Sequence, residues 1–251
     1  MNYFRLYDRL KSSSLSKAEF LKHLGLVGQC IDFESEIEVL KSCGFPLLED
    51  KEHIFLETTK IKWQEQTFCF VDIETTGSKP QSGSIIEIGA LKYRNGEMIG
   101  KFESFVYAKE IPEKITELTG ICAKDICHAP NVRDVLRDFR VFLGDSVFVA
   151  HNVKFDYSFI SHHMESIGLY PLLNPKLCTI DLARKTILSP RYSLGFLNTF
   201  LGINTSVSHR AYADALSALR VFEICLYTLP KAVKSTQDLI DFSKGKCKNI
   251  H

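Results

Sequence analysis

The chain has 251 residues, of which 45% are hydrophobic and 24% charged, and its formal net charge is +1. This composition is typical of a globular protein and excludes a disordered or low-complexity chain. No apolar run reaches the length of a membrane span, and the amino terminus lacks the long apolar stretch of a secretion signal. We therefore expect a cytoplasmic protein without membrane contact, whose eight cysteines, none of them in a CxxC pair, are reduced.

Residues 1–65 are predicted to form a small domain of their own. Ser16 is a plausible cap for a first short helix, and Gly44 is placed to end a second one. Two helices and a hairpin are expected at residues 15–21, 33–43, 45–48 and 53–56. This order resembles a winged-helix domain.

Winged helices often bind DNA, but the charge of this region favours contact with a protein. Residues 1–66 contain 9 Lys and Arg against 11 Asp and Glu, and the second helix exposes Glu34, Glu36 and Glu38. A helix that enters a DNA groove should be basic, because phosphate neutralisation supplies most of the nonspecific affinity. DNA binding remains the alternative.

Strands and helices alternate between residues 66 and 230, the predicted central domain. Strands are expected at residues 67–73, 84–93, 100–107 and 146–150, and helices at 112–118, 131–142, 155–166, 179–187, 193–200 and 210–227. Asn95-Gly96, between two strand-like runs, predicts a hairpin turn. Because the first strands follow one another closely, we expect an α/β fold with a mixed sheet that begins as a meander and is flanked by helices, as in ribonuclease H-like folds.

Two acidic residues close the first strongly apolar strand. Side chains of a strand alternate between its faces, so Asp72 and Glu74 point the same way, beside a core. Two such carboxylates repel each other, and a divalent cation with oxygen ligands would compensate them. The alternative is a strand that runs out into a polar turn.

Two more carboxylates fall on apolar helix faces. Asp156 shares its face with Phe159 and Ile160, and Asp214 lies in a stripe with Ala211 and Ala218. A lone buried charge is costly, so these carboxylates are expected to have partners. The chain thus offers four inward carboxylates.

Three segments carry a family resemblance. The stretches FVDIETTG, HNVKFD and HRAYADA, in this order, resemble the three motifs of the DEDDh 3′–5′ exonucleases, a group that includes the proofreading epsilon subunit of bacterial DNA polymerase III. The stretches IIEIGA and LTGI, with Ala129-Pro130 after them, match as well, so the resemblance spans about Phe68 to Tyr227.

The resemblance implies two divalent cations, Mg²⁺ or Mn²⁺, with Asp72 as the bridging ligand. Glu74 and Asp214 would complete one cation site, and Asp156 would act partly through water. Two cations about 4 Å apart can stabilise both ends of a phosphodiester displacement. No cluster of cysteine and histidine indicates zinc.

His209 is the candidate general base that takes a proton from the attacking water. It precedes Asp214 by five residues, which places it in the loop just before the helix. A lone histidine there is more often a surface or capping residue, but its spacing to the aspartate favours the catalytic role. A sister subclass has a tyrosine where this chain has Arg210.

Substrate contacts are expected from two short segments. The turn of Thr75, Thr76 and Gly77 follows the acidic strand directly and allows close approach of a terminal nucleotide. His151 and Asn152 resemble family positions near the substrate, although an ordinary loop between strand and helix would also explain them.

Residues 231–251 predict a short helix, capped by Ser235 or Thr236, and a basic tail. The stretch Gln237–Phe242 also loosely resembles peptides that dock on bacterial sliding clamps. In the tail, Lys244, Lys246 and Lys248 could contact a nucleic-acid backbone or belong to a solvated chain end.

The resemblance therefore implies a metal-dependent exonuclease that acts on a single-stranded or frayed 3′ end of DNA, in polymerase proofreading or DNA repair. The chain contains no polymerase motif, so a DNA polymerase catalytic subunit is the expected partner. Trimming of RNA is the close alternative, because no feature of the sequence decides the sugar. A binding module that has kept the fold without catalysis is the alternative of a different class.

Overall fold

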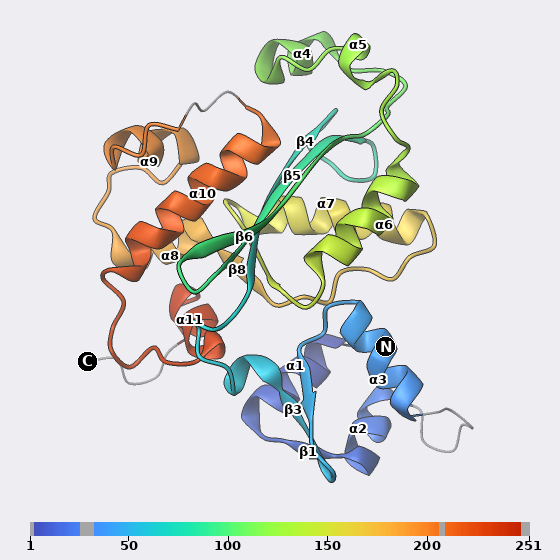
Figure 1. Cartoon of the computed structure of the whole chain (residues 1–251), viewed down its shortest axis with the longest axis vertical. Helices are drawn as coiled ribbons and strands as arrows, with labels where there is room; N and C mark the ends of the chain where they lie inside the picture. Colours follow the sequence, from blue (N-terminus) through green and yellow to red (C-terminus); the bar gives the residue numbers. More distant parts are fainter. Residues whose placement is uncertain (1–2, 26–32, 206–208, 247–251) are drawn as a thin grey trace.

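The computed structural model describes residues 3–25, 33–205 and 209–246, which form a small amino-terminal part and a larger part built on a central sheet (Figure 1). In the small part the order is α1 (Tyr3–Ser12), β1 (Leu15–Ser16), α2 (Lys17–Leu24), α3 (Phe33–Ser42), β2 (Leu47–Glu49) and β3 (His53–Leu56). The three strands form an antiparallel sheet in the order β1-β3-β2. This is a winged-helix-like arrangement.

Local capping explains where α2 lies. The Ser16 hydroxyl accepts a hydrogen bond from the Glu19 N–H, and the Glu19 carboxylate accepts one from the Ser16 N–H. Gly25 follows with φ of 73°, a left-handed conformation that glycine adopts without strain. The predicted cap at Ser16 is confirmed. The helix α1 had not been predicted.

Within the described residues, the central sheet has five strands in the order β6-β5-β4-β7-β8. Their bounds are β4 (Phe68–Thr75), β5 (Ile85–Arg94), β6 (Glu97–Phe105), β7 (Val147–Ala150) and β8 (Lys176–Cys178). The first three pair antiparallel, while β7 pairs parallel with β4 and β8 parallel with β7. The predicted meander is confirmed, with Asn95 and Gly96 at φ of 52° and 84° in the hairpin turn.

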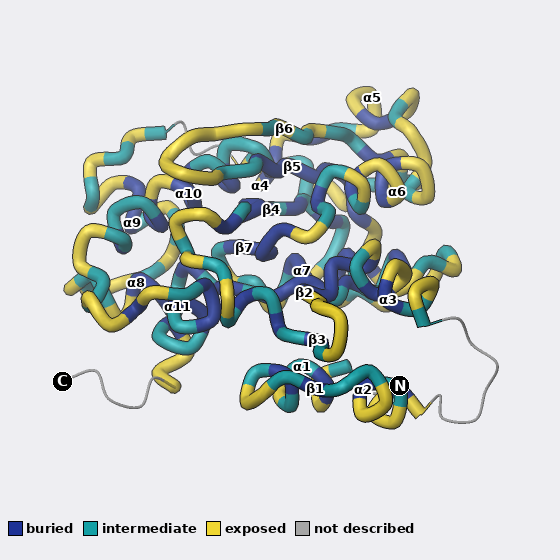
Figure 2. Tube along the Cα trace, turned by 60° about the horizontal axis from the view of Figure 1, so that its bottom comes forward, coloured by how far each residue is buried: buried dark blue, intermediate teal, exposed yellow. Residues whose placement is uncertain are grey.

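Helices cover both faces of this sheet. The helices of this part are α4 (Glu113–Thr119), α5 (Ala123–Ile126), α6 (Val132–Leu143), α7 (Val153–Ser166), α8 (Thr179–Thr186), α9 (Leu194–Phe200), α10 (Ala211–Leu226) and α11 (Thr236–Ser243). Of these, α10 packs on one face of the sheet, and α6 and α7 pack on the other. Alternate residues of β4 serve the two layers: Phe70 packs with Phe222 of α10, whereas Val71 belongs to the core beneath α6 and α7. The central strands β4 and β7 are accordingly the most buried part of the sheet (Figure 2).

The carboxyl-terminal helix α11 joins the two parts of the chain. Gln237 accepts hydrogen bonds from the hydroxyls of Tyr7, at 2.7 Å, and Thr58, at 2.8 Å. Lys11 forms an ion pair with Asp241 at 2.7 Å. Of the two predicted caps, Ser235 is the one that caps α11: its hydroxyl accepts a hydrogen bond from the Asp238 N–H.

This packing counts against the clamp-docking interpretation of Gln237–Phe242, which stays an untested prediction. Gln237 is 5% exposed, Leu239 0% and Ile240 1%, so these three side chains are already buried within the chain, whereas Phe242 is half-buried. Lys248 of the predicted basic tail lies outside the described residues. Among the described residues, no helix combines the length and the apolar character needed to cross a membrane.

Candidate active site at the end of strand β4

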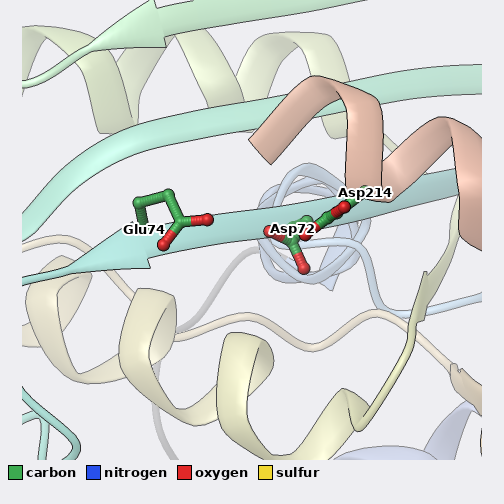
Figure 3. Close-up of side chains that lie close together, drawn as sticks. All are labelled: Asp72, Glu74 and Asp214. Carbon is green, nitrogen blue, oxygen red and sulfur yellow. The ribbon is translucent and has the colours of Figure 1, made fainter. Parts of the chain in front are cut away.

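Three carboxylates converge where β4 runs under the start of α10. Asp72 and Glu74 lie on one face of the strand, and Asp214 comes from the first turn of α10 (Figure 3). One carboxylate oxygen from each can be chosen so that all lie within 4.8 Å of one another. The separation is of the size that a shared cation spans.

A glycine brings α10 this close to the sheet. Gly89 of β5 is the cross-strand neighbour of Asp72, on the same face. A Cβ atom at Gly89 would lie 2.1 Å from the Tyr212 nitrogen and 2.3 Å from the Ala211 carbonyl carbon. Only glycine at position 89 therefore allows α10 to lie close enough to the sheet for Asp214 to reach the carboxylates of β4.

The electrostatics of the cluster are those of crowded carboxylates. Burial raises the pKa of Asp72 well above its usual range, and the charges of Asp156, Asp214 and Glu74 raise it further. Burial, then Asp214 and Glu87, raises the pKa of Glu74 to about 8. The pKa of Asp214 is raised by burial, against the influence of His209.

The donor set of the cluster fits a divalent cation. Asp214 Oδ1 is buried and has no hydrogen-bond donor among the described residues. An oxygen left unsatisfied in this way is costly unless something positive contacts it. Carboxylate oxygens are the ligands that Mg²⁺ and Mn²⁺ prefer. The residues present therefore suit the predicted metal site.

Asp156 lies beside this cluster and is held by backbone. The strand β7 pairs with β4 only along residues 68–70, which leaves the edge of β4 open at Ile73. There Asp156 Oδ1 accepts a hydrogen bond from the Ile73 N–H at 3.2 Å. Asp156 is 3% exposed, and burial raises its pKa to about 7. It lies close enough to Asp72 to raise the pKa of that carboxylate, but it does not belong to the three-carboxylate group.

His209 is exposed and lies two residues before α10. Its φ is 47°, the left-handed region that few residues other than glycine adopt. The helix starts at Ala211, so His209 lies in the loop where the spacing places it. Its role as general base stays a prediction.

Sequence reasoning missed the importance of Glu87 and Arg210. Glu87, in β5, is only 1% exposed and forms an ion pair with Arg210 at 2.7 Å. It lies directly across from Glu74. The signal in the sequence was an acidic residue inside the otherwise apolar stretch IIEIGA, where a buried charge demands a partner.

The turn after β4 is held by its own side chains. The Thr75 hydroxyl donates to the Gly77 carbonyl at 2.8 Å, and the Thr76 hydroxyl accepts from the Ser84 N–H at 2.8 Å. These bonds fix the turn next to Glu74. Contact of Thr75, Thr76 and Gly77 with a nucleotide stays a prediction.

Structural roles account for His151 and Asn152. The two ring nitrogens of His151 lie 2.8 Å from the Thr179 hydroxyl and 2.8 Å from the Tyr192 carbonyl, and burial lowers its pKa. Asn152 directly precedes α7 and has φ of 83°, a left-handed backbone conformation that asparagine adopts more readily than most residues. Their contact with substrate also stays a prediction.

Comparison with known proteins adds an independent line of evidence. A model of the exonuclease family of the RNase T type matches residues 69–222. The chain is 36% identical over 179 residues to the PolC-type DNA polymerase III of Staphylococcus haemolyticus, and equally to that of Staphylococcus epidermidis. In both cases the match covers 70% of this chain but only 12% of the relative.

Solved structures share the fold at low sequence identity. A structure of exonuclease I matches 71% of this chain and 43% of its own, with a TM-score of 0.62 and 17% identity. The structure of Escherichia coli exonuclease I in complex with a dT13 oligonucleotide has a TM-score of 0.61 and 16% sequence identity. The match covers 67% of this chain and 42% of that chain. The structure of cell-death related nuclease 4 has a TM-score of 0.56 and 17% sequence identity. The match covers 65% of this chain and 64% of that chain.

Proposed function

The chain belongs to the DEDDh 3′–5′ exonuclease family, and on this premise we propose that it hydrolyses nucleotides from the 3′ end of DNA with the help of two divalent cations. The substrate is a single-stranded or frayed end, and the role is polymerase proofreading or DNA repair. The convergence of Asp72, Glu74 and Asp214 is the observation that carries the proposal.

Each carboxylate has a part in this proposal. Asp72, Glu74 and Asp214 would hold the cations, and Asp156 would contribute through water. Bound Mg²⁺ or Mn²⁺ would stabilise the charge that develops on the attacking, leaving and non-bridging oxygens of the phosphodiester. The chain itself supplies rigid oxygen donors, since β4, α7 and α10 fix them before substrate arrives.

His209 supplies the proton acceptor. It is exposed in the loop before α10, beside the turn that carries Asp214, and from there it would take the proton of the attacking water. Removing the proton there leaves the carboxylates free to serve as ligands. The turn of Thr75, Thr76 and Gly77 lies next to Glu74 and would receive the terminal sugar.

The relatives favour DNA over RNA as the substrate. The exonuclease I structures include complexes with dT13 and dA16 oligonucleotides and a zinc-bound complex with single-stranded DNA. The PolC-type relatives are DNA polymerases, and the chain spans 12% of their length. A polymerase catalytic subunit is the proposed partner. The sliding clamp is not included, because Gln237, Leu239 and Ile240 of the segment that resembles a docking peptide are buried.

Digestion of short oligonucleotides tests the proposal. DNA and RNA strands labelled at the 5′ end, matched or mismatched at the 3′ end, are incubated with Mg²⁺, Mn²⁺ or chelator. We expect a ladder of DNA products that keep the label, only with cation, and none from Asp72→Ala or Asp214→Ala. Shortening of RNA alone would establish the RNA-trimming alternative. Binding without shortening would establish the non-catalytic one.

A further inference from the structure

Glu87 is a buried carboxylate that the cation chemistry does not use. Its side chain is 1% exposed, and it lies across the strand pair from Glu74. Among the described residues, three N–H donors converge on its two oxygens. Arg210 donates from Nε at 3.1 and 3.2 Å and from Nη2 at 2.7 Å, and the Ala211 N–H donates at 3.1 Å. Oxygens engaged in this way are poor candidates for a cation.

These bonds anchor the first residues of α10. Arg210 occupies the position before the helix, and no capping hydrogen bond from its own side chain is formed there. The Glu87 carboxylate instead accepts from the first helical N–H, at the end where a negative charge is favourable. One side chain of β5 therefore holds both the guanidinium and the backbone at the start of the helix.

The anchored segment lies between two site residues. His209 immediately precedes Arg210, and the N–H of Asp214 donates to the Arg210 carbonyl at 3.0 Å. His209 has a φ of 47°, a conformation that persists only where its surroundings impose it. Any movement of Arg210 thus changes the position of His209 relative to the carboxylates.

The guanidinium is further restrained on its other side. Its carbon lies 5.1 Å from the centre of the Phe105 ring, and the charge of Asp125 acts on it. The planar fork of arginine matches a carboxylate in two-point contact, which a lysine ammonium does not reproduce. The contact therefore fixes the orientation of the Arg210 guanidinium and also neutralises the charge of Glu87.

We propose that Glu87 and Arg210 are positioning residues of the exonuclease: their two-point contact sets the place of His209 over the carboxylates of β4. This inference rests on the proposed function. A purely stabilising ion pair would leave turnover per folded molecule unchanged. A positioning pair acts through His209 and affects the turnover rate.

Arg210→Lys separates these roles, because it keeps the charge and loses the fork. We expect kcat to fall by about 10- to 100-fold, the cost of a displacement of about 1 Å. The KM for a short DNA strand and the increase of Tm on adding Mn²⁺ should stay as in the wild type. Arg220→Lys is the matched control, since Arg220 pairs with Glu223 on the exposed side of the same helix.

A double-mutant cycle completes the test. In a His209→Ala background, Arg210→Lys should cause no further loss of kcat, because the pair acts through the missing imidazole. If the two substitutions lower kcat by factors that multiply in the double variant, or if Arg210→Lys leaves kcat unchanged, the inference is overturned. Glu87→Gln is a second variant, which weakens the same two-point contact by removing the charge of the carboxylate instead of changing the guanidinium.

Hydrogen exchange keeps this test independent of activity. Amides of residues 209–214 should exchange faster in Arg210→Lys than in the wild type, while those of β4 should not change. Equal exchange in this segment would contradict the anchoring. If the wild-type chain shortens no DNA, the proposed function fails, and the exchange result still decides whether the pair holds this turn.

Discussion

At the scale of single residues, the site is a set of carboxylates that destabilise one another in the absence of a cation. Asp72, Glu74 and Asp214 are close enough to share a ligand, and the pKa of each is raised by burial and by neighbouring carboxylates. Folding therefore brings together charges that would be better separated, a cost that a bound cation can offset.

The stability of the cation-free chain should fall as pH rises through the neutral range. The pKa of Glu74 is raised from 4.5 to about 8, so its contribution to stability is complete below about pH 4.5 and lost by about pH 8. Between about pH 6 and pH 8 we expect a loss of about 2 kcal/mol, equivalent to about 4–8 °C in Tm.

Thermal unfolding in chelator between about pH 6 and pH 8 measures this slope. Glu74→Gln should flatten it, because the titrating group is gone. Mn²⁺ should raise the Tm of the wild type more at the higher pH. A wild-type Tm that rises with pH in chelator, with Glu74→Gln behaving identically, would show that the carboxylate is not under strain.

His209→Ala should reduce kcat by about 10²- to 10⁴-fold, the usual contribution of a general base. Affinity for DNA and the cation-induced increase of Tm should persist, because the carboxylates are unchanged. Single-turnover digestion at saturating Mn²⁺ measures the effect. His23→Ala, an exposed histidine of α2, is the control. Turnover equal to that of the wild type would refute the assignment.

Much of the site could be predicted from residue types and spacing. The acidic pair at alternate positions of β4 and the aspartate in the apolar stripe of α10 already implied inward carboxylates. The bond of Asp156 to the Ile73 N–H could not be foreseen, because it depends on where β7 stops. Nor could the partner of Glu87, since only the folded sheet brings Arg210 to it.

At the scale of elements, the close contact between α10 and β5 decides the geometry. Helix α10 packs on the face of β4 and β5 that carries Asp72 and Glu74, and Gly89 gives it room. The helix is also rich in alanine on this side, with Ala211, Ala215 and Ala218 all buried. Small residues on both elements thus set the distance between the carboxylates.

Gly89→Ala should therefore impair both stability and catalysis. The new methyl group would meet backbone atoms of α10 at 2.1–2.5 Å, so the helix must move away. We expect a loss of about 1–3 kcal/mol, typical of overpacking, and a larger proportional loss of activity as Asp214 leaves the cluster.

Chemical denaturation and oligonucleotide digestion check this prediction side by side. Gly195→Ala, in α9, is the matched control, because a Cβ atom there meets nothing within 4 Å. It should leave activity intact and stabilise the helix slightly. An active and fully stable Gly89→Ala variant would mean that α10 does not need its close approach to the sheet.

Long periodic elements were predictable, and short ones were not. The strands of the meander and the helices α6, α7 and α10 carry clear apolar patterns and recognisable turns. In contrast, β8 is three residues long and only Leu177 in it is buried, so its pairing with β7 defines it. The four-residue helix α5 is similarly defined by its surroundings.

At the scale of the whole molecule, the amino-terminal part contacts regions remote from the carboxylates. Its own core consists of residues from α1 to β3 with Leu173 packed against it, and its polar contacts include α11 and the Leu173 N–H, which donates to the Cys43 carbonyl at 2.9 Å. We propose the domain division that the sequence indicated, with residues 66–230 as the exonuclease unit and residues 1–65 as a site for a protein partner.

Deleting residues 1–56 tests this division. The remaining chain keeps residues 57–66, whose backbone contacts the segment leading into α11, including the Thr236 N–H bond to the Ile61 carbonyl at 2.9 Å. Shortening of a short DNA strand should continue, while Tm falls because Gln237 loses the Tyr7 hydroxyl and Asp241 loses Lys11. A folded truncated chain that binds Mn²⁺ yet leaves DNA intact would place part of the active site in the deleted region.

Diffraction from crystals grown with Mn²⁺ and a 3′-terminal nucleotide examines the cation site most directly. The anomalous signal should show two ions about 4 Å apart, both in contact with Asp72, with Glu74 and Asp214 completing the coordination of one. Density for manganese elsewhere, or none among these carboxylates in a preparation that still shortens DNA, would contradict the proposed chemistry.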